Sequence, residues 1–316
     1  MKLGILGAAD IAYRRFLPAL TKCHDVTYAG VASRKPEKGM KFQERYGGQV
    51  YDSYEALIAD NSIDAIYVPL PPAMHFEWGK KVLEAGKHLL MEKPFTTSLC
   101  DTKQLLKLAE EKNLAVYENY MFLYHSQLSK IKALIADGSL GKIRLYRMSF
   151  GFPMRDQGDF RYSKELGGGA LMDCGGYPVR LALELLGDTA KVVYSKLIQP
   201  EEFEVDLYGN VVMENDVGEV AQISFGMDNA YQCQLEVWGS KTTLIAARIF
   251  TAGDDVKPVL ILRTSSDESK MYLEEDDQFL HSIQQFVNKA GSAIKRNDSL
   301  LIQSMTVQEI VERNRR

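Results

Sequence analysis

Residues 2–12 read Lys-Leu-Gly-Ile-Leu-Gly-Ala-Ala-Asp-Ile-Ala, a short apolar run, a glycine turn and the start of a helical pattern. The turn occupies the place of the dinucleotide-binding fingerprint G-x-G-x-x-G, here altered to Gly7-x-Ala9-x-x-Ala12. Gly7 would supply the tight turn, Ala9 still lets the backbone approach a pyrophosphate, and Ala12 allows the helix to pack closely on the strand. Alone, the stretch equally fits a plain strand–turn–helix with small residues, so the rest of the chain has to decide.

The same alternation of strand and helix continues to about residue 117. After a first helix that ends near residue 21, we expect strands at 26–32, 65–69, 88–91 and 115–117 and helices at 54–59, 73–85 and 100–112. Repeated units of this length predict a doubly wound parallel sheet, the Rossmann arrangement, which binds ligands at the carboxyl ends of its strands. Asp10 and Ile11, at the start of the first helix, would then offer backbone N–H groups to the cofactor phosphates.

The end of the second strand indicates which dinucleotide is bound. In NAD-binding folds an acidic residue about 20 positions beyond the glycines holds the ribose hydroxyls. Here the strand ends in Ser33 and Arg34, with Lys35 and Lys38 just beyond. A hydroxyl and a guanidinium suit a ribose 2′-phosphate, and Arg34 could also lie flat on the adenine. A solvated basic loop is the alternative, but the position at a strand end favours NADP(H).

The third strand is followed by a proline-rich loop. Residues 69–72 read Pro-Leu-Pro-Pro, a stiff segment in which Leu70 and Pro71 could form one side of the cofactor site. His75 lies in the helix that follows and is a further candidate for the cofactor site.

The next strand ends in Glu92-Lys93-Pro94. This places Lys93 at the sheet edge where a nicotinamide would lie, with Glu92 beside it. A surface lysine is the alternative, but a proline directly after the lysine restricts its backbone, which favours a functional role. Asn119, directly after the following strand, is also expected to contact the cofactor.

The pattern changes after residue 120. A helix at 127–136 is followed by mostly alternating extended segments, and terminal helices are expected at 277–289 and 300–314. Alternating strands predict a largely antiparallel sheet with one open face. The predicted fold is therefore α/β plus α+β, with a dinucleotide-binding Rossmann domain at 1–120 and a substrate-binding and oligomerisation domain at 121–316. The extended segments are 143–152, 191–198, 205–213, 219–225, 232–238, 242–247 and 259–263.

A glycine-rich stretch interrupts these strands. Residues 167–178 read Gly-Gly-Gly-Ala-Leu-Met-Asp-Cys-Gly-Gly-Tyr-Pro and open a helical pattern. Three glycines make a loop that can approach a ligand closely. Asp173 and Tyr177 are four residues apart, so on an α-helix they share a face and form a candidate proton-transfer site. The alternative is a helix entry with a dipole-favoured Asp and a half-buried Tyr. Cys174 is expected to be a small packing residue rather than a nucleophile.

The composition excludes several function classes. The chain has 316 residues, a net charge of −4, 46% hydrophobic and 25% charged residues, which fits two globular domains without a broad basic surface for nucleic acid or anionic lipid. It shows neither signal-peptide anatomy nor an apolar run near the ~20 residues that span a bilayer. Its four cysteines have no CxxC spacing, so neither disulfides nor a metal site is expected. These features predict a cytoplasmic protein.

Three motifs together resemble the Gfo/Idh/MocA oxidoreductases. They are the altered glycine turn, Glu-Lys-Pro at 92–94, and Gly-Gly-Gly-Ala at 167–170 leading to Asp173 and Tyr177. The likeness covers the whole chain in order, and within the family the chain is similar to NADPH-dependent sugar-nucleotide (dTDP-sugar) C3-ketoreductases of deoxysugar biosynthesis. Many family members carry His where this chain has Tyr177, whereas the ketoreductases and the similar xylose and dihydrodiol dehydrogenases carry Tyr. The altered glycine turn departs from the common family pattern. The supporting stretches are 9–15, 68–71, 118–125, 158–162 and 225–227.

The resemblance implies hydride transfer between a nicotinamide and a sugar carbon. Tyr177 would donate a proton to the developing alkoxide. Lys93 would favour ionisation of the phenol, whose free pKa is ~10, and would stabilise charge on the substrate oxygen. Asp173 would orient Lys93 or a substrate hydroxyl, and Arg161 would reach a cofactor or substrate phosphate. The residues expected near the substrate are Tyr124, His125, Arg180 and Gln278.

Two other functions remain open from the sequence. An NADP-dependent dehydrogenase of free sugars or trans-dihydrodiols would share Lys93 and Tyr177. An NADP(H)-binding regulator would keep the fold without turnover, although the intact Lys–Asp–Tyr set argues against it. The open face of the second sheet also predicts a homo-oligomer, a dimer or tetramer, because such a face needs to be covered or polar.

Overall fold

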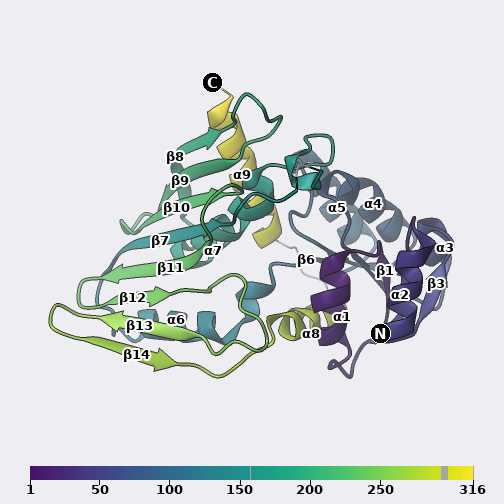
Figure 1. Ribbon diagram of the computed structural model, residues 1–316, viewed down its shortest axis with the longest axis horizontal. Helices are drawn as coiled ribbons and strands as arrows, with labels where there is room; N and C mark the ends of the chain where they lie inside the picture. The colour runs from purple at the N-terminus through teal and green to yellow at the C-terminus, as the bar shows by residue number, and fades with distance from the viewer. Residues whose placement is uncertain (157, 293–297, 316) are drawn as a thin grey trace. The chain divides into compact units, whose positions relative to one another are not determined.

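The computed structural model describes residues 1–156, 158–292 and 298–315 (Figure 1). The chain forms two compact units, residues 1–121 with 279–301 and residues 122–278 with the chain from 302 onward. Within the described ranges, none of the helices combines the length and apolarity needed to cross a bilayer.

The first unit is built on a parallel sheet of six strands in the order β3-β2-β1-β4-β5-β6. Its strand order reverses beside β1, the position at which doubly wound sheets bind their ligands. All four residues of β4 are buried, as expected for a strand covered by helices on both faces. The Rossmann prediction is confirmed. The strands are β1 (Lys2–Leu6), β2 (Thr27–Ala32), β3 (Gln49–Tyr51), β4 (Ala65–Val68), β5 (His88–Met91) and β6 (Val116–Glu118).

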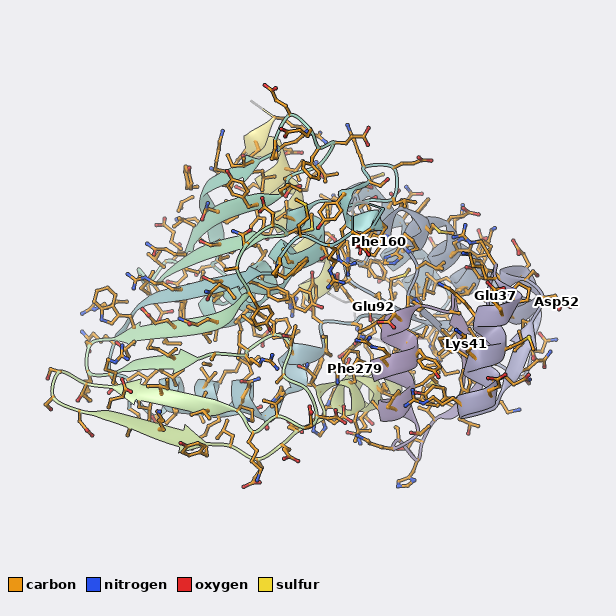
Figure 2. All side chains as sticks on the ribbon, viewed as in Figure 1. Glu37, Lys41, Asp52, Glu92, Phe160 and Phe279 are labelled. Atoms are coloured by element: carbon orange, nitrogen blue, oxygen red, sulfur yellow. The ribbon has the colours of Figure 1, made fainter. Side chains whose placement is uncertain are left out.

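Two elements of this unit were missed by the sequence analysis, β3 and the helix α2 (Pro36–Tyr46). Only two residues of α2 are buried, and the charged side chains of Glu37 and Lys41 project from it (Figure 2). Apolar periodicity is therefore too weak to reveal this helix. The other helices are η1 (Ala12–Phe16), α1 (Leu17–Leu20), α3 (Tyr54–Ala59), η2 (Pro72–Met74), α4 (His75–Glu84), α5 (Leu99–Glu111) and α8 (Gln278–Ala290).

The second unit contains an eight-stranded sheet in the order β14-β13-β12-β11-β7-β10-β9-β8. Only β7 and β10 pair in parallel, and the other neighbours are antiparallel. This confirms the predicted open-faced antiparallel sheet, because buried and exposed residues alternate along β9 and β10. The strands are β7 (Ile143–Gly151), β8 (Lys191–Ile198), β9 (Tyr208–Glu214), β10 (Val220–Gly226), β11 (Gln232–Gly239), β12 (Thr243–Ala246), β13 (Val259–Arg263) and β14 (Glu268–Tyr272).

The helices of the second unit include α7, which contacts β7 and β10 in the middle of the sheet. The strand β14 was not predicted, because it is largely exposed at the sheet edge and its side chains carry no apolar alternation. The remaining helical elements are η3 (Met121–Tyr124), α6 (Ser126–Ala136), η4 (Phe160–Tyr162), η5 (Leu171–Gly175), α7 (Gly176–Leu186) and α9 (Asp298–Asn314).

Candidate active site

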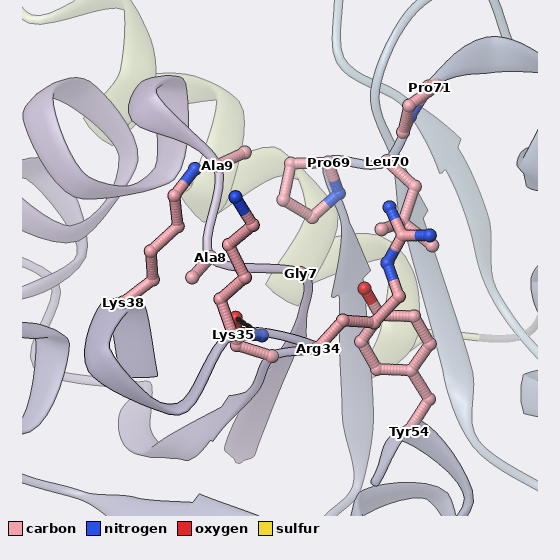
Figure 3. Close-up of a pocket in the computed structure, with 11 residues that line it drawn as sticks. Gly7, Ala8, Ala9, Arg34, Lys35, Lys38, Tyr54, Pro69, Leu70 and Pro71 are labelled. Atoms are coloured by element: carbon pink, nitrogen blue, oxygen red, sulfur yellow. Dashed lines mark hydrogen bonds between the residues drawn. The ribbon is translucent and has the colours of Figure 1, made fainter. Parts of the chain in front are cut away.

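The first unit holds a cavity of about 530 Å³ beside the carboxyl ends of β1, β2 and β4 (Figure 3). Three cationic side chains line it, and no carboxylate does among the residues described. These residues come from four separate segments of the sequence, which the strand order of the parallel sheet brings together. The lining residues are Gly7, Ala8, Ala9, Ser33, Arg34, Lys35, Lys38, Tyr54, Pro69, Leu70 and Pro71.

Gly7 lies in the turn after β1 that lines this cavity. Its φ of +107° lies in the region that favours glycine, and an added Cβ would stand 2.6 Å from the Leu70 Cδ2 atom. Its amide donates to the Ala32 carbonyl at 2.9 Å, which ties the turn to the neighbouring strand end. The turn therefore requires glycine for both its conformation and its close contact with Leu70.

One wall of the cavity is basic. Arg34, Lys35 and Lys38 surround the start of α2, where Pro36 occupies the first turn. The Ser33 hydroxyl accepts a hydrogen bond from the Lys35 amide at 3.2 Å. A helix N-terminus with cationic side chains attracts anions, so this wall suits a phosphate.

Tyr54 lines the same cavity and was not among the predicted site residues. Ser53 caps α3 by accepting from the Ala56 amide at 3.0 Å, and Tyr54 is the first residue of that helix. Its ring meets Trp78 edge-on at 4.8 Å between centroids. Burial raises the pKa of Tyr54, although the charge of Arg34 and hydrogen bonding to it oppose the shift. A tyrosine directly after a Ser cap was the only sequence signal for this position.

His75 does not line the cavity and is fully buried. Its Nδ1 lies 2.8 Å from the Pro94 carbonyl oxygen and its Nε2 lies 2.8 Å from the Leu70 carbonyl oxygen. Both ring nitrogens therefore face the protein backbone. His75 therefore joins the cavity wall to the segment that carries Lys93, and its direct contact with a cofactor remains a prediction.

Glu92 and Asn119 hydrogen-bond each other at the carboxyl ends of β5 and β6. The Oε1 atom of Glu92, a residue labelled in Figure 2, accepts from the Tyr67 hydroxyl at 2.6 Å and from Asn119 Nδ2 at 2.7 Å. The Ser282 hydroxyl in α8 donates to Asn119 Oδ1 at 2.8 Å. These bonds fix the backbone next to Lys93, and direct contact of Glu92 or Asn119 with a cofactor remains a prediction.

In the second unit, the glycine loop is packed against the protein itself. A Cβ added to Gly168 would stand 2.3 Å from the Arg161 carbonyl oxygen, and one added to Gly169, whose φ is +117°, would stand 2.5 Å from Asp206 Oδ1. Asp206 Oδ2 also accepts from the Leu171 amide at 2.8 Å at the start of the helical segment. Gly168 and Gly169 are thus needed for packing within the chain, and close approach of this loop to a ligand remains a prediction.

Asp173 pairs with Arg161 within the second unit. Arg161 Nε donates to Asp173 Oδ2 at 2.8 Å, and Nη1 donates to Asp159 Oδ1 at 3.0 Å. Burial would lower the pKa of Arg161, but the two carboxylates outweigh it and the net shift is upward. The Nε and Nη1 groups of Arg161 are thus bonded to carboxylates, and contact of this residue with a cofactor or substrate phosphate remains a prediction.

Tyr177 stands in an aromatic cluster. Its ring centroid lies 5.1 Å from Phe150, 5.8 Å from Phe122 and 6.0 Å from Phe250. The preceding residues, Leu171–Gly175, form a π-helical turn. The expectation of a regular α-helix through Asp173 and Tyr177 is therefore wrong over this turn, which closes i→i+5 bonds. Cys174 is buried, and its Sγ donates to the Ala170 carbonyl at 3.3 Å.

The four predicted substrate residues all belong to the second unit. His125 is buried and caps α6 by accepting from the Gln127 amide, and Gln278 donates to the Ala252 carbonyl at 2.8 Å. Arg180 pairs with Glu184 at 3.4 Å. Each of these three thus supports the fold, while Tyr124 ends the short helix η3. Their contact with a substrate remains a prediction.

Known proteins match the chain over both units. Residues 1–120 match the family described as "Oxidoreductase family, NAD-binding Rossmann fold", and residues 128–245 match the "GFO/IDH/MocA C-terminal domain". A dTDP-3,4-didehydro-2,6-dideoxy-alpha-D-glucose 3-reductase from Actinomadura kijaniata is 38% identical over 286 residues, covering 90% of this chain and 86% of the relative. The chain belongs to the Gfo/Idh/MocA oxidoreductase family.

Solved structures of the Gfo/Idh/MocA family agree with this assignment. KijD10, a 3-ketoreductase from Actinomadura kijaniata in complex with NADP and TDP-benzene, matches with a TM-score of 0.96 at 36% identity, covering 99% of this chain and 98% of that one. Variants of KijD10 with a tyrosine changed to phenylalanine or a lysine changed to alanine have also been crystallised. A D-xylose 1-dehydrogenase (NADP(+)) 2 from Haloferax volcanii is 33% identical over 230 residues, covering 72% of this chain and 70% of the relative.

In this Gfo/Idh/MocA oxidoreductase the structure brings together half of the cofactor residues expected from the sequence. Asp10 and Ile11 follow the cavity-lining turn along the chain, whereas Arg161 belongs to the second unit. The predicted residues that line the cavity are Gly7, Ala9, Ser33, Arg34, Lys38, Leu70 and Pro71.

Proposed function

We propose that this enzyme reduces a keto group, at C3, of a nucleotide-linked deoxysugar with NADPH. The observation that carries the proposal is the similarity over about nine tenths of the chain to a dTDP-sugar 3-reductase. KijD10, a 3-ketoreductase of nearly identical fold, binds both NADP and a TDP compound. We propose that residues 1–120 bind the cofactor and that residues 121–316 bind the substrate and make the subunit contacts.

The cavity of the first unit fits NADP(H). Gly7 keeps the turn close to the cavity, while Ser33, Arg34 and Lys38 offer one hydroxyl and two positive charges without an opposing carboxylate in the lining. A 2′-phosphate provides the negative charge that such a wall stabilises, and NADH lacks it. Arg34→Ala is therefore expected to weaken NADPH binding by about 10- to 100-fold, the range of a charge-assisted hydrogen bond, and to affect NADH far less. Equal affinities of the wild type for NADPH and NADH would contradict this assignment.

Tyr177 and Lys93 are the proposed catalytic residues. The bound nicotinamide supplies the hydride. Tyr177 would pass its hydroxyl proton to the alkoxide oxygen, and the Lys93 ammonium would stabilise charge on that oxygen. Asp173, held by Arg161, would keep the helical turn before Tyr177 in place. The aromatic cluster fixes the Tyr177 ring, so its hydroxyl needs no reordering before proton transfer.

Oxidation of a free sugar is the second candidate, supported by the xylose dehydrogenase relative. A thermal-shift experiment with NADPH separates the two functions, because a ligand that binds the native state raises stability by about 2.7 kcal/mol at 100 times its Kd. We expect an added shift with thymidine diphosphate and none with xylose. A shift with xylose alone would favour the dehydrogenase, and NADPH consumption with a nucleotide-linked 3-keto sugar would confirm the reductase.

We also propose that the enzyme is a homo-oligomer assembled through the second sheet. Several large apolar side chains on its strands are exposed, and burying them against a second copy would stabilise an assembly. Sedimentation at micromolar concentration should give a dimer or tetramer, and a strictly monomeric mass would refute the proposal. The exposed residues are Val193, Tyr194, Tyr208, Trp238 and Tyr272.

A further inference from the structure

Tyr54 is a buried residue whose side chain nevertheless reaches the cofactor cavity. Only 7% of it is exposed, yet it is one of the cavity-lining residues. Its ring is fixed edge-on against Trp78 at 4.8 Å, and the Trp78 ring is covered on its face by the Lys81 ammonium at 3.9 Å. The Tyr54 hydroxyl lies 3.9 Å from the position of a Cβ added to Gly7. The Tyr54 phenol is therefore held in one position beside the glycine turn.

Arg34, unlike Tyr54, is not held in place by burial. It is exposed and follows the end of β2, so in isolation its long side chain would sample many rotamers. Figure 3 shows its guanidinium lying beside the Tyr54 hydroxyl, and Arg34 opposes the rise in the pKa of that hydroxyl through its charge and through hydrogen bonding. Since a guanidinium has no acceptor, Arg34 donates and the hydroxyl oxygen accepts. This contact beside a fixed phenol favours one Arg34 orientation within the cavity.

We infer that Tyr54 is a positioning residue for cofactor choice, which holds the Arg34 guanidinium ready for the ribose 2′-phosphate. The inference rests on the proposed NADPH function. An arginine fixed before binding loses less side-chain entropy when it pairs with a phosphate. The benefit applies only to the phosphorylated dinucleotide, because NADH has no 2′-phosphate for Arg34 to meet. Tyr54 thus acts on selectivity through Arg34.

The test replaces the hydroxyl and keeps the ring. Tyr54→Phe should weaken NADPH binding by about 3- to 10-fold, the range of one modest hydrogen bond, and leave NADH binding within about 2-fold. Dissociation constants of both cofactors, measured by fluorescence titration, give the ratio that a general loss of stability would not change. The control is Tyr51→Phe, which removes the hydroxyl of another buried tyrosine, bonded to Asp60 at 2.6 Å and outside the cavity lining, and should keep the wild-type ratio. Equal losses for NADPH and NADH in Tyr54→Phe would overturn the inference.

A double-mutant cycle tests whether Tyr54 acts through Arg34. In an Arg34→Ala background, Tyr54→Phe should have no further effect on NADPH binding, because the group that it orients is gone. The same loss with and without Arg34 would mean that the hydroxyl touches the cofactor itself, which would overturn the positioning role. If wild-type protein shows no preference for NADPH, the proposed function fails; if it does and Tyr54→Phe keeps that preference, only this inference fails.

Discussion

His75→Ala tests how the cavity wall is held to the Lys93 segment. The fully buried imidazole lies between the Leu70 and Pro94 carbonyl oxygens, each at 2.8 Å. A neutral ring donates from one nitrogen, so its loss leaves one buried carbonyl without its donor, at about 1–3 kcal/mol. The lost ring packing adds a similar amount, and we expect about 2–5 kcal/mol of destabilisation. Urea unfolding measures the free energy, and NADPH titration should show weaker binding because the Leu70 wall is loosened.

The pH dependence of the same variant gives a second measurement. Burial lowers the pKa of His75, although its two carbonyl partners oppose the shift. The unfolded chain therefore binds the His75 proton first, near a pKa of ~6.5, and the stability of the wild type falls as the pH drops below that value, by up to about 1.4 kcal/mol per pH unit. His88 is shifted in the same direction, but it is present in both proteins. The stability difference between the wild type and His75→Ala should thus shrink between pH 7 and pH 5.

His24→Ala is the matched control, because His24 is exposed in a turn. It should change the free energy of unfolding by less than about 0.5 kcal/mol. If His75→Ala is as stable as this control, the imidazole does not hold the Leu70 and Pro94 segments together. If the stability difference is constant with pH, the buried imidazole is not neutral in the folded protein.

Two further predictions concern the proposed catalytic pair and the glycine loop. Tyr177→Phe should lower kcat by about 10²–10⁴-fold, as for a general acid, while folding and NADPH binding survive because the ring stays in its aromatic cluster; near-normal kcat would make Tyr177 a packing residue. Lys93→Met should lose comparable activity, and the double variant should lose much less than the product of the two, which steady-state kinetics can check. Gly168→Ala should destabilise the protein by about 1–3 kcal/mol because its Cβ would meet backbone at 2.3 Å, whereas Gly158→Ala, with no atom within 4 Å, should not; equal thermal midpoints would refute the steric account.

The architecture was largely readable from the sequence. Alternating apolar strands and helices predicted the parallel sheet, and β5 and β8 have the expected bounds, His88–Met91 and Lys191–Ile198. The prediction succeeds because a strand or helix that buries one face needs apolar residues at the spacing of its backbone repeat, and this spacing is visible in the sequence. The elements that were missed, α2, β3 and β14, are short or mostly exposed, so burial leaves little periodic signal in them.

The sequence also placed Gly7, Arg34 and Leu70 at one cavity, because parallel strands end at a shared edge. It could not say which partner each polar side chain takes. The sequence did not show that His75, which was expected to contact the cofactor, bonds two backbone carbonyls, or that Arg161, which was expected to contact a phosphate, pairs with Asp173. Tyr54 gave almost no signal and lines the cavity. A hydrogen bond depends on distances of a few ångströms between groups far apart in the chain, so only the tertiary structure decides it.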